Sequence, residues 1–116
     1  MNSLELLKGA SNVRQFRGVY MRNELKNLKV RRNESAIINL DTTRGPGTHW
    51  VTYIKRGLKA IYFDPFGLPP PKELIKYLRP ARIYYTTDQV QRLKDTNCGR
   101  LCLNFLHNKN KWIQFL

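Results

Sequence analysis

The sequence predicts an α+β protein in which an antiparallel-rich sheet packs against helices. Runs rich in β-branched and aromatic residues fill the middle of the chain, and segments with helical apolar periodicity precede, separate and follow them. The length of 116 residues suits one domain, and a chain of this size buries roughly two-thirds of its unfolded surface. We therefore expect residues 1–116 to form a single compact domain.

The first part of the chain predicts a helix, a turn and a strand. Residues 3–9, SLELLKG, form a short helical pattern closed by Gly9. Residues 16–25, FRGVYMRNEL, combine a turn glycine with apolar residues and predict a turn leading into a short helical segment. The apolar run SAIINLD at 35–41 predicts a buried strand, and TTRGPGT at 42–48 predicts a loop.

The middle of the chain predicts a hairpin followed by a helix. HWVTYIK (49–55) and KAIYFDPFG (59–67) read as strands, and the intervening RGL suits a tight turn. Three prolines then suit a helix N-terminus. The apolar face of that helix is expected from Leu74, Ile75 and Leu78.

The last part predicts one or two strands and a helix. RIYYT (82–86) reads as a strand, and DQVQRL (88–93) is a candidate for another. The helix begins at about Cys98. Its inward face is expected to consist of Leu101, Cys102, Phe105 and Leu106.

The composition is that of a strongly basic globular protein. Hydrophobic residues make up 41% of the chain, which argues against disorder, and the net charge is +13 with a pI near 10.2. A field of this strength attracts polyanions. We expect sequence-independent DNA binding, with Lys29, Arg31 and Arg32 as candidate contacts, because no stretch resembles a base-reading helix. A merely solubilising surface is the alternative.

Cysteine use and hydropathy indicate a reducing compartment. Cys98 and Cys102 are four residues apart on the predicted helix, a poor geometry for a disulfide, so both are expected as free thiols. No apolar run approaches a membrane span, and the opening MNSLELLKG lacks the pattern of a signal peptide. We expect an intracellular protein, or one packaged in a particle assembled there, with no membrane partner.

Cys98 is the candidate nucleophile. It stands where the polar loop KDTN meets an apolar helix, and the N–H groups and dipole of a helix N-terminus lower a thiol pKa. Gly99 is expected to leave room for a substrate backbone beside the sulfur. The alternative is a structural cysteine that opens a helix.

His49 is the candidate base and Asp64 its partner. Of the two histidines, His107 lies in a polar helix end, whereas His49 lies at a loop-to-strand junction. His49 is eight residues before the hairpin centre near Gly57 and Asp64 is seven after it, so the two can face each other across adjacent strands. A carboxylate there would hold the imidazole tautomer. The alternative is that Asp64 only initiates an Asp-Pro turn.

The residues alone do not decide which groups would stabilise the oxyanion. The backbone N–H of Cys98 is one candidate, and a side-chain amide from Gln91 or Gln89 is the other. The chemistry does not choose between these two glutamines.

The order of these motifs resembles the adenovirus-type cysteine endopeptidases, which include adenain and the maturation proteases of adenovirus-like viruses and Polinton (Maverick) elements. The match consists of GTHW, then YFDPFG, then Gln-(six residues)-Cys-Gly-x-x-Cys, and it runs from about Phe16 to Leu106. FRGVYMRNEL and AIINL also resemble segments of that family. The resemblance implies Gln91 rather than Gln89, because the family's glutamine is seven residues before the cysteine.

The resemblance also implies a fold and a function. The fold would be papain-like and of the adenain type, a mixed sheet packed against helices with the catalytic order His49, Asp64, Gln91 and Cys98. The function would be cleavage of viral or virus-like precursor proteins at glycine-containing sites, in the virion and the host nucleus or another reducing compartment. No cofactor would be required for the chemistry, and DNA would act as an activity enhancer.

Two departures and two alternatives accompany the resemblance. The chain ends at Leu116, whereas the adenoviral enzymes continue with a further helical region. The chain also lacks the cysteine through which those enzymes bind an activating peptide covalently. A covalent activating peptide is therefore not expected, and Cys102 is expected to pack in the core. The alternatives are a SUMO- or ubiquitin-like-protein isopeptidase of the same fold and a non-catalytic nucleic-acid-binding module.

Overall fold

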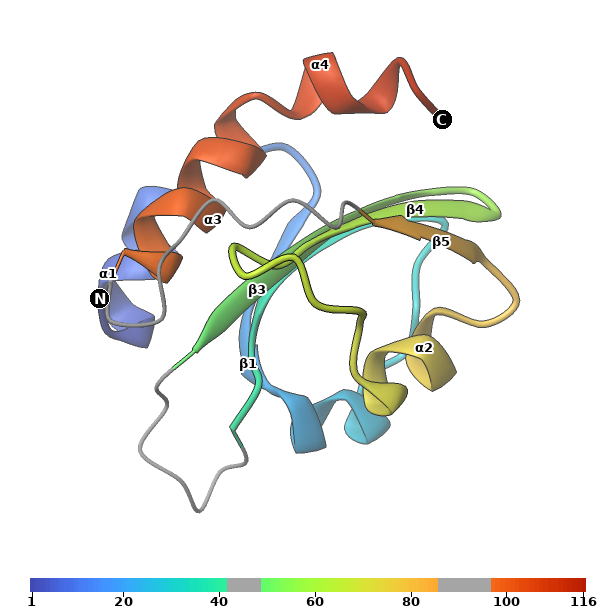
Figure 1. Cartoon of the computed structure of the whole chain (residues 1–116), viewed down its shortest axis with the longest axis horizontal. Coiled ribbons are helices and arrows are strands. Elements are labelled where there is room, and N and C mark those ends of the chain that lie inside the picture. The colour runs from blue at the N-terminus through green and yellow to red at the C-terminus, as the bar shows by residue number, and fades with distance from the viewer. Residues whose placement is uncertain (42–48, 86–96) are drawn as a thin grey trace.

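A five-stranded sheet forms the centre of the computed structural model, which describes residues 1–41, 49–85 and 97–116. The strands lie side by side in chain order, β1-β2-β3-β4-β5. Their bounds are β1 (Phe16–Met21), β2 (Asn33–Asn39), β3 (Trp50–Arg56), β4 (Lys59–Phe63) and β5 (Arg82–Tyr85). With helices on both faces (Figure 1), the α+β class predicted from the sequence is confirmed.

The sheet is mixed rather than antiparallel-rich. The central pairs β2–β3 and β3–β4 are antiparallel, but the outer pairs β1–β2 and β4–β5 are parallel. Each parallel pair is connected through a helix, the 3₁₀ helix η1 (Arg22–Asn27) or the α-helix α2 (Lys72–Leu78). Such a crossover returns the chain to the end of the sheet at which it started, which a tight hairpin cannot do.

Helices cover the two faces of the sheet and enclose two apolar clusters. The helices α1 (Ser3–Gly9), α3 (Cys98–His107) and α4 (Lys109–Ile113) lie on one face, and η1 and α2 lie on the other (Figure 1). Because side chains alternate along a strand, β3 contributes to both clusters. Trp50 and Ile54 pack toward α1 and α3, whereas Val51 and Tyr53 belong to the cluster on the opposite face.

Most predicted elements are present with small shifts in their bounds, and three details are corrected. Gly18 lies in β1, where the register shifts and its φ is 140°, so FRGVY is an irregular strand and not a turn. Ile75 is 39% exposed and does not belong to the inward face of α2. Leu101 is only half-buried, whereas Cys102, Phe105 and Leu106 are buried as expected.

The predicted loop at 42–48 and the candidate strand at 88–93 lie outside the described residues. Within the described part of the chain, no helix has the length and apolarity that crossing a bilayer requires.

Candidate active site

The β3–β4 hairpin brings His49 and Asp64 together. Thr52 pairs with Phe63 in the antiparallel ladder, and continuing that register past the last pair puts residues 49 and 64 on the same face, at the same end of the sheet. The His49 Nε2 atom lies 2.9 Å from the Asp64 Oδ1 atom. The contact expected from counting along the hairpin is therefore formed.

Asp64 also initiates the turn that follows β4, so the two interpretations of this residue hold together. Its Oδ1 atom accepts a hydrogen bond from the Phe66 N–H at 2.8 Å, and its carbonyl accepts one from the Gly67 N–H at 2.8 Å. Gly67 has a φ of 72°, which favours glycine. The carboxylate is only 1% exposed, so the turn holds it rigidly beside the imidazole.

Phe66 stacks on the His49 ring, a contact that the sequence analysis did not assign. The ring centroids are 4.5 Å apart and the planes differ by 11°. With Asp64 bonded to one ring nitrogen and Phe66 covering one ring face, the imidazole is fixed in both position and tilt. Extending the hairpin register to residue 66, which falls opposite residue 49, would have identified this partner.

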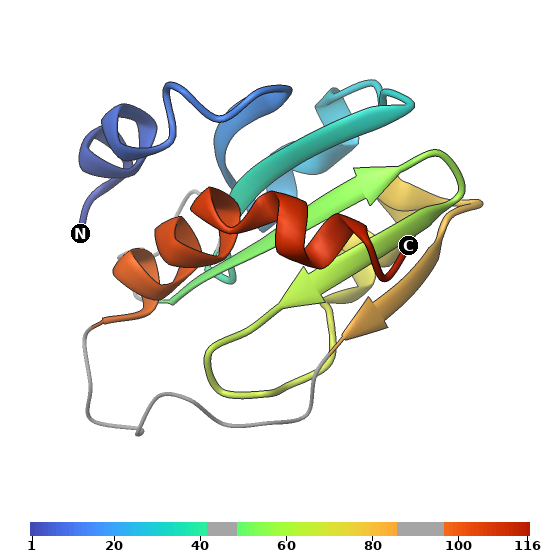
Figure 2. The same cartoon turned by 90° about the horizontal axis from the view of Figure 1, so that it is seen from above.

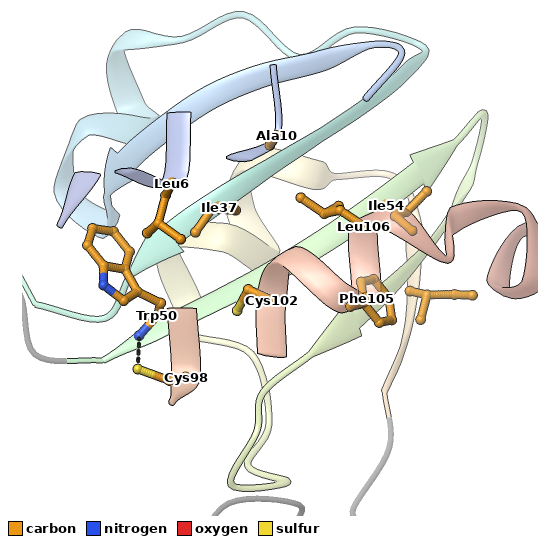
Figure 3. Packing of buried hydrophobic residues seen from close by; sticks show 10 residues of the cluster. Leu6, Ala10, Ile37, Trp50, Ile54, Cys98, Cys102, Phe105 and Leu106 are labelled. Atoms are coloured by element: carbon orange, nitrogen blue, oxygen red, sulfur yellow. Dashed lines mark hydrogen bonds between the residues drawn. The ribbon is translucent and has the colours of Figure 1, made fainter. Parts of the chain in front are cut away.

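Cys98 is the first residue of α3, and its sulfur lies against the start of β3. The backbone N–H of Trp50 donates to the Cys98 Sγ atom at 3.4 Å (Figure 3). His49 and the backbone N–H of Gly99 are also hydrogen-bonded to this sulfur. Because Asp64 occupies His49 Nε2, the ring nitrogen left for the sulfur is Nδ1.

The electrostatics of this group favour an ion pair between a thiolate and an imidazolium. Burial acts to lower the pKa of His49, but the hydrogen bonds and charges of Asp64 and Cys98 outweigh it and raise this pKa to about 9. Burial acts to raise the pKa of Cys98, but the hydrogen bonds from His49 and from the Trp50 N–H outweigh it and lower this pKa. Each group thus stabilises the charged form of the other.

Two neighbours of Cys98 have structural roles. Cys102 is fully buried, and burial raises its thiol pKa well above the ordinary value, as suits a core residue.

A Cβ at Gly99 would lie 3.2 Å from Leu6 Cδ2 and from Met1 Cβ and 3.4 Å from Trp50 Cδ1. The expectation that Gly99 makes room for substrate is therefore wrong, because this glycine lets α3 pack closely against α1 and β3.

The predicted oxyanion donors are only partly described. Gln91 and its competitor Gln89 lie outside the described residues. The backbone N–H of Cys98 belongs to the first turn of α3, where N–H groups have no acceptor within the helix. His107 is exposed, and its Nε2 atom lies 2.8 Å from the Gly9 carbonyl oxygen, away from the Cys98 group.

The described residues contain no group of three or more His, Cys, Asp and Glu side chains that could hold a metal ion.

The three predicted DNA contacts lie on the η1 side of the sheet and divide into two kinds. Lys29 lines a groove of about 880 Å³ between η1 and α2. Arg31 and Arg32 are exposed beside it, and their carbonyls accept hydrogen bonds from the Lys55 ammonium. The other cations that line the groove are Arg22, Lys26, Lys72, Lys76 and Arg79.

The fold is shared with ASFV pS273R protease. The two structures align with a TM-score of 0.62 at 16% sequence identity, over 92% of this chain and 54% of that protein. A selenomethionine form of the same protease aligns with a TM-score of 0.50 at 20% identity, over 67% of this chain and 34% of that one. The chain thus spans about half the length of the protease that it resembles, and the papain-like fold expected from the sequence is confirmed.

No protein-family model and no curated protein matches the sequence.

The arrangement of His49, Asp64 and Cys98 contains three of the parts that nucleophilic thiol catalysis needs. It supplies a thiol whose pKa is lowered by His49 and by N–H donors, a histidine beside it whose pKa is raised, and a carboxylate that orients the ring. Such a group can attack a carbonyl carbon and protonate a leaving group.

Replacing Asp64 with Asn tests the origin of the ion pair. Asn keeps an acceptor for the His49 ring and the Phe66 N–H but removes the charge, so the pKa of His49 should fall from about 9 toward its ordinary value of 6.5. NMR titration of the ring protons measures this pKa, and the His107 signal should be the same in both proteins. An unchanged His49 pKa in Asp64→Asn would show that Asp64 does not hold the charge.

The raised pKa of His49 also makes the stability of the protein depend on pH. Because the pKa of His49 is raised on folding, its contribution to stability is fully present below pH 6.5 and is lost as the pH rises through about 9. The destabilisation caused by Asp64→Asn in urea denaturation should therefore be larger at pH 6 than above pH 9.

Proposed function

We propose that this protein is a cysteine endopeptidase that cleaves viral or virus-like capsid and core precursor proteins at glycine-containing sites during particle maturation. The observation that carries the proposal is the contact of His49 with both Asp64 and Cys98 at one end of the sheet. The fold shared with a viral protease and the motif resemblance to adenovirus-type enzymes support it further.

The proposed reaction follows from the contacts of the three side chains. The Cys98 thiolate attacks the carbonyl carbon of the scissile peptide, and the negative charge that develops on the oxygen is stabilised by the Cys98 N–H and the Gln91 amide. His49 then gives its proton to the leaving amine, which yields an acyl-enzyme. A water molecule activated by His49 hydrolyses the acyl-enzyme, while Asp64 keeps the ring oriented throughout.

DNA is the proposed activity enhancer, and no cofactor is needed for the bond-breaking steps. The cations between η1 and α2, together with Arg31 and Arg32, give this face the charge that phosphate binding needs. DNA would confine the enzyme and a DNA-bound precursor to the same track, in the virion and in the host nucleus or another reducing compartment.

Substitutions of the site residues test the activity. Cys98→Ala should abolish cleavage of a proteome-derived peptide library, read by mass spectrometry with and without DNA. Cys102→Ala should retain cleavage and lose about 1 kcal/mol of stability, because it leaves a small core cavity. Gln91→Ala should lower turnover roughly 10²–10³-fold, whereas the matched Gln89→Ala should not.

Three outcomes would contradict this assignment. Equal loss of activity in the two cysteine variants, at normal stability, would remove Cys98 as the nucleophile. A Gln89→Ala protein that is inactive beside an active Gln91→Ala protein would reverse the choice of oxyanion donor. Exclusive cleavage of modifier proteins after a Gly-Gly terminus would favour the isopeptidase alternative.

Replacing Lys29, Arg31 and Arg32 with Ala tests the DNA interaction. Affinity for mixed-sequence duplex should fall while cleavage of a small peptide without DNA stays unchanged, because these residues lie away from Cys98. For the unmodified protein, the plot of log affinity against log salt should have a slope of about −0.9 per phosphate contacted. The control replaces the exposed cations Lys8, Arg82 and Lys111. Equal weakening by both triple variants, or affinity independent of salt, would reject the proposed contact surface.

A further inference from the structure

A second cationic pocket lies away from the candidate active site, where three distant parts of the chain meet. Its volume is about 390 Å³, within the roughly 300–1,000 Å³ typical of small-molecule sites. The wall residues come from the loop after α1, the end of β3 and the junction of α3 with α4: Asn12, Val13, Arg14, Arg56, Leu106, His107, Lys109 and Asn110.

This pocket is separated from Cys98 by the length of an element. Helix α3 begins at Cys98 and ends at His107. Strand β3 begins at Trp50, beside the sulfur, and ends at Arg56, in the pocket wall. The ten residues of α3 span roughly 15 Å along the helix axis. Figure 2 shows α3 continuing into α4 across the sheet toward the C-terminus, away from the end at which Cys98 lies. The pocket is therefore not an extension of the active site.

The charges around the pocket are all of one sign. Arg14, Arg56 and Lys109 line it, and no Asp or Glu of the described residues does. Burial lowers the pKa of Lys109, and the positive charges of Arg56 and Arg14 lower it further. Three cations that repel one another raise the free energy of the folded protein unless an anion binds among them.

Two of these cations have hydrogen-bond donors left over. Lys109 is only 8% exposed, and the one hydrogen bond found for its ammonium among the described residues goes to the Arg14 carbonyl. An ammonium carries three donors. The Nε atom of Arg56 is buried and has no hydrogen-bond partner in the same part of the structure. Buried charged donors without acceptors are unfavourable, so the site is complete only with an acceptor-rich ligand.

The remaining wall residues favour a small polar ligand over a peptide. Asn12 and Asn110 contribute amide groups, and Val13 and Leu106 are the apolar side chains of the described lining. The contact of His107 with the Gly9 carbonyl anchors the wall that the end of α3 forms. Guanidinium and ammonium groups that converge from separate elements match the several oxygens of a phosphate group.

We propose that the pocket formed by Arg14, Arg56 and Lys109 is a binding site for a multiply charged phosphate group. The phosphate comes either from a free polyphosphate or from the backbone of a nucleic acid, since both offer the same oxygens. Binding joins the α3–α4 junction to the end of β3 and therefore stabilises the fold. This site is independent of the proposed peptidase activity and of the Lys29, Arg31 and Arg32 surface.

The test measures binding of sodium tripolyphosphate by isothermal titration calorimetry at constant ionic strength. We expect one site per chain and a rise in melting temperature with ligand concentration. Arg14→Gln should weaken binding about tenfold, because it removes one charge-assisted hydrogen bond. Arg14 is exposed, so this change leaves the core intact. The matched control Arg79→Gln, which removes an exposed arginine from the groove on the other face, should stay within twofold.

Lys109→Met provides a second variant, because it keeps the buried aliphatic stem while removing the ammonium. It should weaken tripolyphosphate binding at least as much as Arg14→Gln, with circular dichroism confirming the fold.

Repeating the titration with a short mixed-sequence duplex distinguishes the two sources of the phosphate. If the pocket variants lose tripolyphosphate binding but bind the duplex as before, the natural ligand is a free polyphosphate. If they lose binding of both tripolyphosphate and the duplex, the pocket takes backbone phosphate. Absence of tripolyphosphate binding, unchanged affinity in both pocket variants, or equal weakening by Arg79→Gln would overturn the proposal.

Discussion

The register of the β3–β4 hairpin is the constraint on which the rest of the site depends. Pairing Thr52 with Phe63 sets which residues share a face, and it places His49 and Asp64 together at the end of the ladder. A slip of one residue would turn Asp64 to the other face of the sheet. The apolar alternation of β4 prevents such a slip, because it would also exchange Ala60 and Tyr62 with Ile61 and Phe63 between two different clusters.

The hairpin also positions the sulfur, although Cys98 is far away in the sequence. Trp50 follows His49 directly, so its backbone N–H, which donates to Cys98, is fixed by the same register. Helix α3 approaches closely enough because Gly99 has no side chain to separate it from Leu6 and Trp50. One strand end therefore supplies a partner for the sulfur and carries the base, and the packing of α3 completes the group.

Burial of this group is tolerated because its charges compensate one another. Asp64 is 1% exposed and Cys98 is 5% exposed, so each would be unfavourable as an isolated ion. The imidazolium of His49 lies between them and pairs with both. The stability of each charged form thus depends on the other two, which links the chemistry of the site to the integrity of the sheet end.

Sequence reasoning succeeded where local rules decide and failed where tertiary packing does. Counting along the hairpin predicted the His49–Asp64 contact, and the change from polar loop to apolar helix located Cys98 at the start of α3. The parallel outer pairs, the role of Gly99 and the irregularity at Gly18 depend on which distant segments pack together, and no local pattern records that. The +13 charge predicted polyanion binding but did not show that the cations divide between two faces.

The most direct test of the thiolate–imidazolium pair is the pH dependence of iodoacetamide alkylation, resolved by residue with mass spectrometry. We expect Cys98 to alkylate rapidly well below the ordinary thiol pKa of about 8.5, while buried Cys102 stays unmodified in the folded protein. In His49→Ala, the reactivity of Cys98 should decline at neutral pH and return only as the pH approaches the ordinary thiol value. Identical pH profiles in the two proteins, or equal labelling of both cysteines, would show that Cys98 and His49 do not form this ion pair.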